Sequence, residues 1–275
     1  MIICRQFLTI WWDAEMKNEI LRVFSFYFYL AKKSTRTRIF LLLSSAAVLM
    51  SLVIRVYRLA GNWTESGQVI FQNFLMVFFL QFLIVLLALF YGTSTVVEEL
   101  ENRTLPYLTA RPVARAAIII GKFLGYLTLT TILLFFSILL SYLILNLDRQ
   151  FGMGDLWTII RYSLVLWLGL AAYLSFFTFL GTWLRKPILV GLAFGFGWES
   201  VIQYFPGTTQ KLSIAHYLKS LLPQYTSSSG KLGFLFIRLE PTKPVLAVII
   251  LIAIILFFLT LASLIFTYRE YLFED

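Results

Sequence analysis

Residues 98–122 read EELENRTLPYLTARPVARAAIIIGK, a charged stretch with two prolines between two long apolar runs. The preceding run, residues 69–91, and the following run, residues 123–147, each reach the roughly 20 residues that a helix needs to cross a bilayer. The composition of the whole chain agrees, with 60% hydrophobic and 13% charged residues, whereas a soluble domain carries about 25% charged residues. The sequence therefore predicts an all-α integral membrane protein.

The sequence predicts six transmembrane helices. Their expected ranges are residues 39–57, 69–91, 123–147, 157–184, 187–205 and 244–268. Helices are expected because a backbone that faces lipid must satisfy its own hydrogen bonds. The chain then divides into an N-terminal segment (1–38), a six-helix membrane domain (39–268) and a tail (269–275). Within the membrane domain, residues 92–115 form one polar connection and residues 206–243 the longest loop.

The lysines and arginines predict the orientation. Fourteen of the 23 fall on the side that also carries both termini and residues 98–122. Because positive loops face the cytoplasm, both termini and the 98–122 connection are expected inside, in a multi-pass plasma (inner) membrane protein. Arg55 and Arg58 lie near the opposite end of the first span and are exceptions to this pattern.

Two segments outside the spans are predicted to be helical. Residues 15–33 are rich in aromatic residues and are followed by KKSTRTR, which favours a helix lying in the membrane interface. This helix serves either as an anchor alone or also as a contact for a partner subunit. In the loop 206–243, Ile214, Leu218, Leu221 and Leu222 recur at helical spacing, which predicts short helices on the outer surface.

Few residues are suited to catalysis or to metal binding. The chain has one cysteine and one histidine, whereas a typical structural zinc site needs four ligands. His216 is expected to be solvated in its loop. The net charge of +9 is explained by membrane topology, so no nucleic-acid partner is expected. No G-x-x-x-x-G-K-[ST] motif occurs, so the chain is not expected to bind a nucleotide itself.

The order of residues within 98–122 predicts a shape for the connection. Acidic residues favour the N-terminal turn of a helix, and proline is tolerated at the first helical position. We therefore expect a short helix parallel to the membrane, a break near residues 110–112, and then the third span. Lys122 is expected to extend back to the lipid headgroups. A plain connection that carries topogenic charge is the alternative.

The same stretch resembles the signature of ABC-2 type permeases, the membrane subunits of type-2 ABC exporters. The resemblance rests on the two glutamates, the TL pair, Leu108, the RPVAR run and the final GK. Arg103 stands where the family often has glycine, and Pro106 is unusual. The family's interfacial N-terminal helix, six spans and long outer loop between spans five and six extend the resemblance over the whole chain.

The resemblance implies that this connection is a coupling helix that docks on a cytoplasmic ABC ATPase. The implied contact residues are Glu98, Glu99, Glu101, Arg103, Thr104, Leu105, Leu108, Arg111, Pro112 and Arg115. It further implies that the chain is a non-catalytic subunit that forms the substrate pathway with a second copy or a paralogue. ATP and magnesium would bind to the partner ATPase, and no cofactor to this chain.

Polar residues within the predicted spans suggest a translocation path. Gln72 and Gln81 lie in the second span and Glu199 in the fifth, and ionisable groups inside membranes tend to face a protein interior or a water-filled cavity. Glu199 either lines the path or reaches outer water. A stand-alone secondary carrier or channel, or a membrane-embedded enzyme, is the alternative function, but neither internal repeats nor a cluster of catalytic residues supports one.

Overall fold

The computed structural model describes residues 14–62, 66–101, 114–147, 152–202, 208–222 and 242–269. All regular structure in these ranges is helical. The long rods are α3 (Thr35–Tyr57) with its π-helical continuation η1 (Arg58–Asn62), the rod of α4 (Gly67–Phe74), η2 (Leu75–Leu83) and α5 (Ile84–Glu101), then α7 (Arg115–Leu145), α8 (Met153–Trp183) and α12 (Pro244–Tyr268). These five rods are long and apolar enough to cross a membrane, and they match five of the six predicted spans.

The remaining predicted span, residues 187–205, forms a shorter rod. It consists of α9 (Pro187–Leu192), the π-helical η3 (Ala193–Trp198) and α10 (Glu199–Ile202). At 1.5 Å per residue the rod is about 24 Å long, less than the roughly 30 Å of a hydrocarbon core. The chain thus has five full-length apolar rods and one short one, and the six-span topology stays a prediction.

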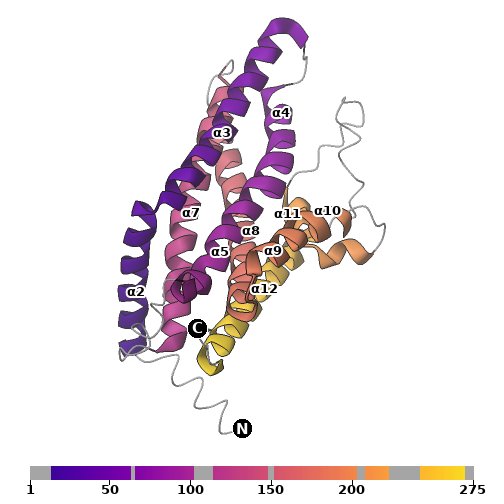
Figure 1. The fold of residues 1–275 in the computed structure, drawn as a ribbon. Coiled ribbons are helices and arrows are strands. Elements are labelled where there is room, and N and C mark those ends of the chain that lie inside the picture. Colours follow the sequence, from indigo (N-terminus) through magenta and orange to yellow (C-terminus); the bar gives the residue numbers. More distant parts are fainter. Residues whose placement is uncertain are drawn as a thin grey trace.

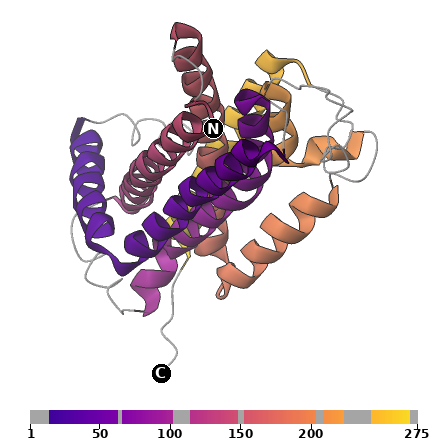
Figure 2. The same cartoon turned by 90° about the horizontal axis from the view of Figure 1, so that it is seen from above.

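The rods form a bundle with a well-defined base (Figure 1). We call base the end at which α2 (Ala14–Lys33) begins, α5 and α8 end, α7 begins and α12 ends. The N-terminal end of α2 and the C-terminal end of α12 therefore lie at the same end of the bundle. Seen from above, α9–α11 lie on the side of the bundle away from α2 (Figure 2).

The centre of the bundle is α8, packed closely on α5. Of the most apolar window of α8, 78% is buried, against 22% for α3 and 17% for α12. Glycines allow the close approach: an added Cβ would lie 2.7 Å from Phe177 Cβ at Gly92 and 2.8 Å from the Thr93 carbonyl oxygen at Gly181. α3 and α12 consequently lie at the periphery and leave apolar faces for lipid or for other protein.

Helix α2 lies at the outside of the bundle and packs along the first half of α7. An added Cβ at Gly121 would lie 2.6 Å from Val23 Cγ1, and one at Gly125 would lie 3.3 Å from the Phe28 backbone nitrogen. Glycines spaced by four residues let two helix backbones approach closely. The helix Ala14–Lys33 covers the residues 15–33 that were expected to be helical, and Phe26 and Tyr29 are exposed on it; its position in the membrane interface stays a prediction.

The loop after α10 turns back into the bundle. The structure has a short helix here, α11 (Ile214–Leu221), preceded by the 3₁₀ turn η4 (Thr208–Leu212). Its expected position on the outer surface was wrong, because Ile214 and Leu218 are buried and an added Cβ at Gly169 of α8 would meet Leu218 at 2.5 Å. The apolar stripe that predicted the helix is thus the face that it buries against α8.

His216 is also buried, with 1% of its surface exposed, so its expected solvation was wrong. Its Nε2 lies 2.9 Å from Thr242 Oγ1, and the backbone N–H of Thr242 donates to Ser220 Oγ at 3.2 Å. These bonds attach α11 to Thr242, which lies two residues before the start of α12. Burial, together with the positive charges of Lys211 and Lys219, lowers the pKa of His216.

The two arginines that were exceptions to the charge pattern have a structural role. Arg55 Nη1 donates to the Ile144 carbonyl at 2.6 Å, and Arg58 Nη1 donates to the Leu145 carbonyl at 3.2 Å. Carbonyls in the last turn of a helix have no partner within it, and a cation is favourable there. Both arginines therefore cap the end of α7 that lies away from the base.

The α5–α8 contact predicts the effect of adding one methyl group. Gly181→Ala places a Cβ against the backbone of α5, and overpacking of this kind costs about 1–3 kcal/mol. We expect a lower melting temperature in detergent. The matched control is Gly154→Ala in the same helix, where an added Cβ meets nothing within 4 Å. Equal melting temperatures for the two variants would contradict this packing.

The burial of His216 predicts a pH dependence. A histidine with a lowered pKa stays neutral when folded, whereas the unfolded chain takes up a proton below about pH 6.5. Stability contributed by the neutral ring is therefore present above that pH and is lost as the pH falls. We expect the melting temperature to drop more between pH 7.5 and 5.5 in the unmodified chain than in His216→Gln. An equal drop would show that His216 does not contribute.

Candidate functional site at the helix ends that flank residues 102–113

The end of α5 and the beginning of α7 flank residues 102–113, which lie outside the described ranges, and a buried ion pair joins them. Lys122 of α7 is 1% exposed, and its Nζ lies 2.7 Å from Glu99 Oε1 of α5. The same ammonium group donates to the Thr95 carbonyl at 2.8 Å. The expected extension of Lys122 to the headgroups was therefore wrong, because its charge is neutralised inside the protein.

A third helix completes this contact. Tyr27 of α2 is 3% exposed, and its hydroxyl donates to Glu99 Oε1 at 2.9 Å. The Lys122 ammonium lies 4.3 Å from the centre of the Tyr27 ring, within the range of a cation–π interaction. We call Tyr27, Glu99 and Lys122 the base triad. It ties together one residue each from α2, α5 and α7.

The corner between α2 and α3 is attached to α5 as well. Thr37 Oγ1 donates to the Ala31 carbonyl at 2.5 Å and lies 2.8 Å from the Tyr91 hydroxyl. Ser34 caps the start of α3 by accepting from the Arg36 N–H. α2 is thus attached to α5 at two points, at Tyr27 and at the bend between α2 and α3.

The acidic residues before residue 102 are placed differently from the prediction. Glu98, Glu99 and Glu101 belong to the last turns of α5 and do not open a new helix. Negative charge is unfavourable at the C-terminal end of a helix dipole. Lys122 offsets this at Glu99 and also supplies a donor for the Thr95 carbonyl, which explains why a lysine is required at this depth.

The start of α7 is held from two sides. The Ala114 N–H donates to Glu19 Oε2 of α2 at 3.1 Å; Ala114, at the N-cap position, has no side-chain acceptor of its own. Arg115 Nη1 donates to the Thr267 carbonyl in the last turn of α12 at 3.0 Å. Ala114 and Arg115 are therefore hydrogen-bonded to α2 and to α12, respectively.

Three of the predicted coupling residues are placed here with their backbones in α5, and Arg115 with its backbone in α7. The others, Arg103, Thr104, Leu105, Leu108, Arg111 and Pro112, lie outside the described residues. Sequence reasoning missed Tyr27 and Glu19 and gave Lys122 another role. A lysine at the start of an apolar span was the available signal, since a buried cation requires a partner.

The predicted path residues do not gather in one place. Glu199 is 2% exposed; it accepts hydrogen bonds from the Ser213 hydroxyl and, at 3.0 Å, from the Ile214 N–H. It therefore caps the N-terminus of α11, where a carboxylate is favourable. Gln81 Nε2 lies 3.4 Å from Ser200 Oγ, whereas Gln72 is buried earlier in the same rod.

Two π-helical segments meet beside Gln81. The rings of Phe82 in η2 and Phe196 in η3 lie 6.0 Å apart, and Val77 of η2, Trp198 of η3 and Val201 of α10 are exposed. π-helical turns occur often at functional sites. The face formed by η2 and η3, rather than the surroundings of Glu199, combines polar groups with exposed apolar side chains.

Among the described residues no group of histidine, cysteine, aspartate or glutamate could hold a metal ion.

The comparison with known families agrees with this architecture. The chain matches the ABC-2 family transporter protein over residues 19–271, a range that begins at Glu19 and includes all of α3 to α12. The chain therefore belongs to the ABC-2 family and is a multi-pass membrane component of an ABC-type transporter. No curated protein matches the chain significantly.

The base triad predicts a large penalty for breaking the ion pair. Lys122→Met leaves Glu99 without its cation in a buried site, and removing one partner of a buried pair costs about 3–5 kcal/mol. Tyr27→Phe removes one hydrogen bond to a charged group, worth about 1.5–3 kcal/mol. Melting temperatures should therefore fall most for Lys122→Met and less for Tyr27→Phe.

The double variant Lys122→Met with Glu99→Met provides the control. Replacing both partners removes the uncompensated charge, so its stability should lie above that of Lys122→Met alone. Additive losses in the double variant would show that the two side chains do not interact.

Proposed function

We propose that this chain is the permease subunit of an ABC exporter, driven by ATP hydrolysis on separate cytoplasmic ATPase subunits. In this proposal residues 102–113 form the coupling element, the base faces the cytoplasm, and two permease copies enclose the substrate pathway. Membership in the ABC-2 family supports the transporter class. The same family resemblance in residues 98–122 supports the docking role.

The observation that carries the proposal is the rigid attachment of both ends of residues 102–113. Glu99 lies two residues before the end of α5, and Lys122 lies in the second turn of α7; their ion pair closes the loop between the two helices. A force on this connection is therefore passed to α5, α7 and, through Tyr27, α2. A connection that carried only topogenic charge would need no such closure.

The pathway is assigned to the face formed by η2 and η3. Val77, Trp198 and Val201 of the two rods that make the Gln81–Ser200 contact are exposed, which offers apolar surface with few polar groups. Ligand sites are commonly of this composition. Glu199 acts here as the cap that positions α11, so it shapes this region without facing the cargo.

The proposal predicts different effects for substitutions of two neighbouring glutamates, Glu98 and Glu99. Glu98→Lys should weaken the association with the ATPase more than tenfold, because breaking an interfacial charge pair costs about 2–5 kcal/mol, while the permease keeps its melting temperature. Glu99→Lys should lower the melting temperature, because it places a cation beside Lys122. The measurement is the amount of vanadate-sensitive ATPase that co-purifies with the tagged chain from its native membrane.

The purified chain alone should not hydrolyse ATP. Hydrolysis by the isolated chain, or unchanged ATPase recovery with Glu98→Lys, would contradict the proposed division of labour between permease and ATPase.

A further inference from the structure

Helix α12 has the smallest buried share of the five long rods. Only 17% of its most apolar window is buried. Near the base it contributes Ala262 and Phe266 to a small apolar cluster with Val96 of α5 and with Ile118 and Ile119 of α7. α12 is also far in sequence from residues 102–113, so no short stretch of chain links it to the coupling element.

Two arginines add polar contacts to this packing at the base. Arg115, the first residue of α7, donates to the Thr267 carbonyl of α12 at 3.0 Å. Arg269, directly after α12, donates through Nη1 to the Thr182 carbonyl at 2.9 Å and also to the Trp183 carbonyl. The last turn of α12 is therefore bonded to α7 on one side and to α8 on the other.

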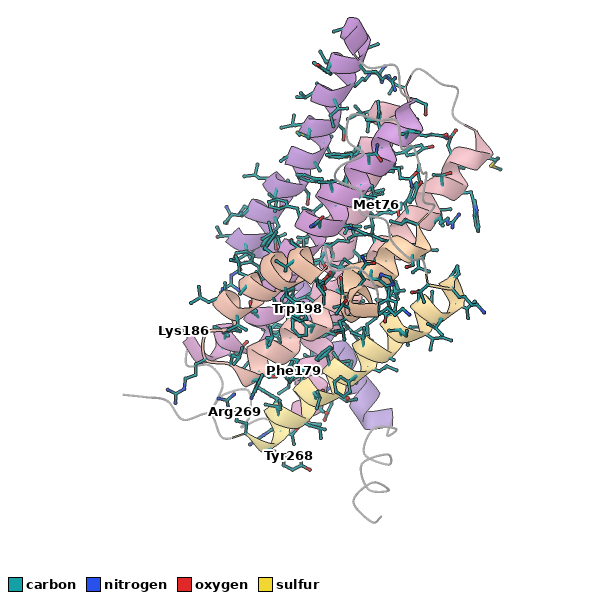
Figure 3. All side chains as sticks on the ribbon, turned by 90° about the vertical axis from the view of Figure 1, so that its right-hand side faces the viewer. Met76, Phe179, Lys186, Trp198, Tyr268 and Arg269 are labelled. Carbon is teal, nitrogen blue, oxygen red and sulfur yellow. The ribbon has the colours of Figure 1, made fainter. Side chains whose placement is uncertain are left out.

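Figure 3 shows this end of the molecule. Arg269 and Tyr268 lie at the end of α12 near Phe179 of α8, and Lys186 lies at the same end of the bundle. Phe179 packs against the apolar cluster and against Phe258 of α12, with ring centres 5.4 Å apart. The arginine contacts thus lie at the edge of a small apolar contact between α8 and α12.

These bonds are of a kind that resists separation. Carbonyls in the last turn of a helix carry partial negative charge and have no partner within the helix. A guanidinium presents several N–H groups in a fixed plane and stays charged at all relevant pH values. One Arg269 side chain can therefore hold two carbonyls of α8 while its own backbone N–H closes the last turn of α12 on Ile265 at 2.8 Å.

We propose that Arg115 and Arg269 are positioning residues that make α12 follow α7 and α8 when the coupling element moves. Each arginine joins the end of α12 to a helix that is itself fixed at the base, α7 through the triad and α8 through its close packing on α5. The motion imposed on residues 102–113 is thereby passed to a peripheral helix that is far from them in sequence. This inference rests on the proposed function, since it requires an ATPase that moves the base.

The test uses the complete permease–ATPase complex in detergent. In a Cys4→Ser background, a single cysteine replaces Val245, which is 73% exposed at the end of α12 away from the base. The reaction rate of this cysteine with a maleimide is measured without nucleotide and after trapping with ATP and vanadate. With both arginines unmodified, the labelling rate should differ between the nucleotide-free complex and the complex trapped with ATP and vanadate.

Arg269→Gln should leave ATP hydrolysis intact and reduce the nucleotide-dependent change in labelling rate about tenfold, since a hydrogen bond to a charged group contributes a factor of that order. Arg269→Lys should restore part of the change, because an ammonium can still donate to one carbonyl. The matched control is Lys186→Gln, which removes a cation at the same end of the bundle, three residues after the end of α8. Lys186 is exposed, and the described residues show no hydrogen bond to its side chain.

If no ATPase co-purifies with the chain, the proposed function fails and the inference falls with it. If the complex forms and labelling of the parent protein does not respond to nucleotide, the movement of α12 is refuted while the proposed function stands. If the parent responds and Arg269→Gln responds equally, or if Lys186→Gln loses the response as well, the positioning role of Arg269 is refuted while the proposed function stands.

Discussion

The ion pair between Lys122 and Glu99 is the constraint on which the base of this protein depends. Burying one charge in a low-dielectric interior is costly, and burying two is tolerated only with close contact and further hydrogen bonds. The structure supplies both, at 2.7 Å and with donors or acceptors from Thr95 and Tyr27. Because each partner requires the other, α5 and α7 must meet here, and α2 must lie close enough for Tyr27 to reach them.

The same physical solution recurs at other helix ends. Glu19 receives the N–H at the start of α7, Glu199 caps α11, and arginines from neighbouring rods bind the last carbonyls of α7, α8 and α12. Unpaired backbone groups are costly where water is scarce. Charged residues near the membrane therefore act here in pairs with helix ends, which fixes the relative positions of rods whose apolar surfaces alone specify them poorly.

The sequence predicted the elements better than their contacts. Five spans, the N-terminal helix and α11 followed from hydrophobic length and periodicity. The burial of α11 and His216 did not, because an apolar stripe shows that a helix has a buried face but not which surface covers it. The partner of Lys122 was also missed: Glu99 and Tyr27 are 23 and 95 positions away, and only the packing of α2 on Gly121 and Gly125 brings the three together. The acidic run was assigned to the wrong helix end because charge preference at helix termini is weak compared with a buried ion pair.

We infer that the ends of α2, α5 and α7 on either side of residues 102–113 form one mechanical unit. Hydrogen exchange measured by mass spectrometry on the unmodified chain and on Lys122→Met tests it most directly, since exchange reports the opening of cooperative units. Loss of the triad should lower protection together in residues 19–31, 95–101 and 114–125, while residues 153–165 of α8 stay protected. Loss of protection confined to α7, or spread evenly over the whole bundle, would contradict the claim.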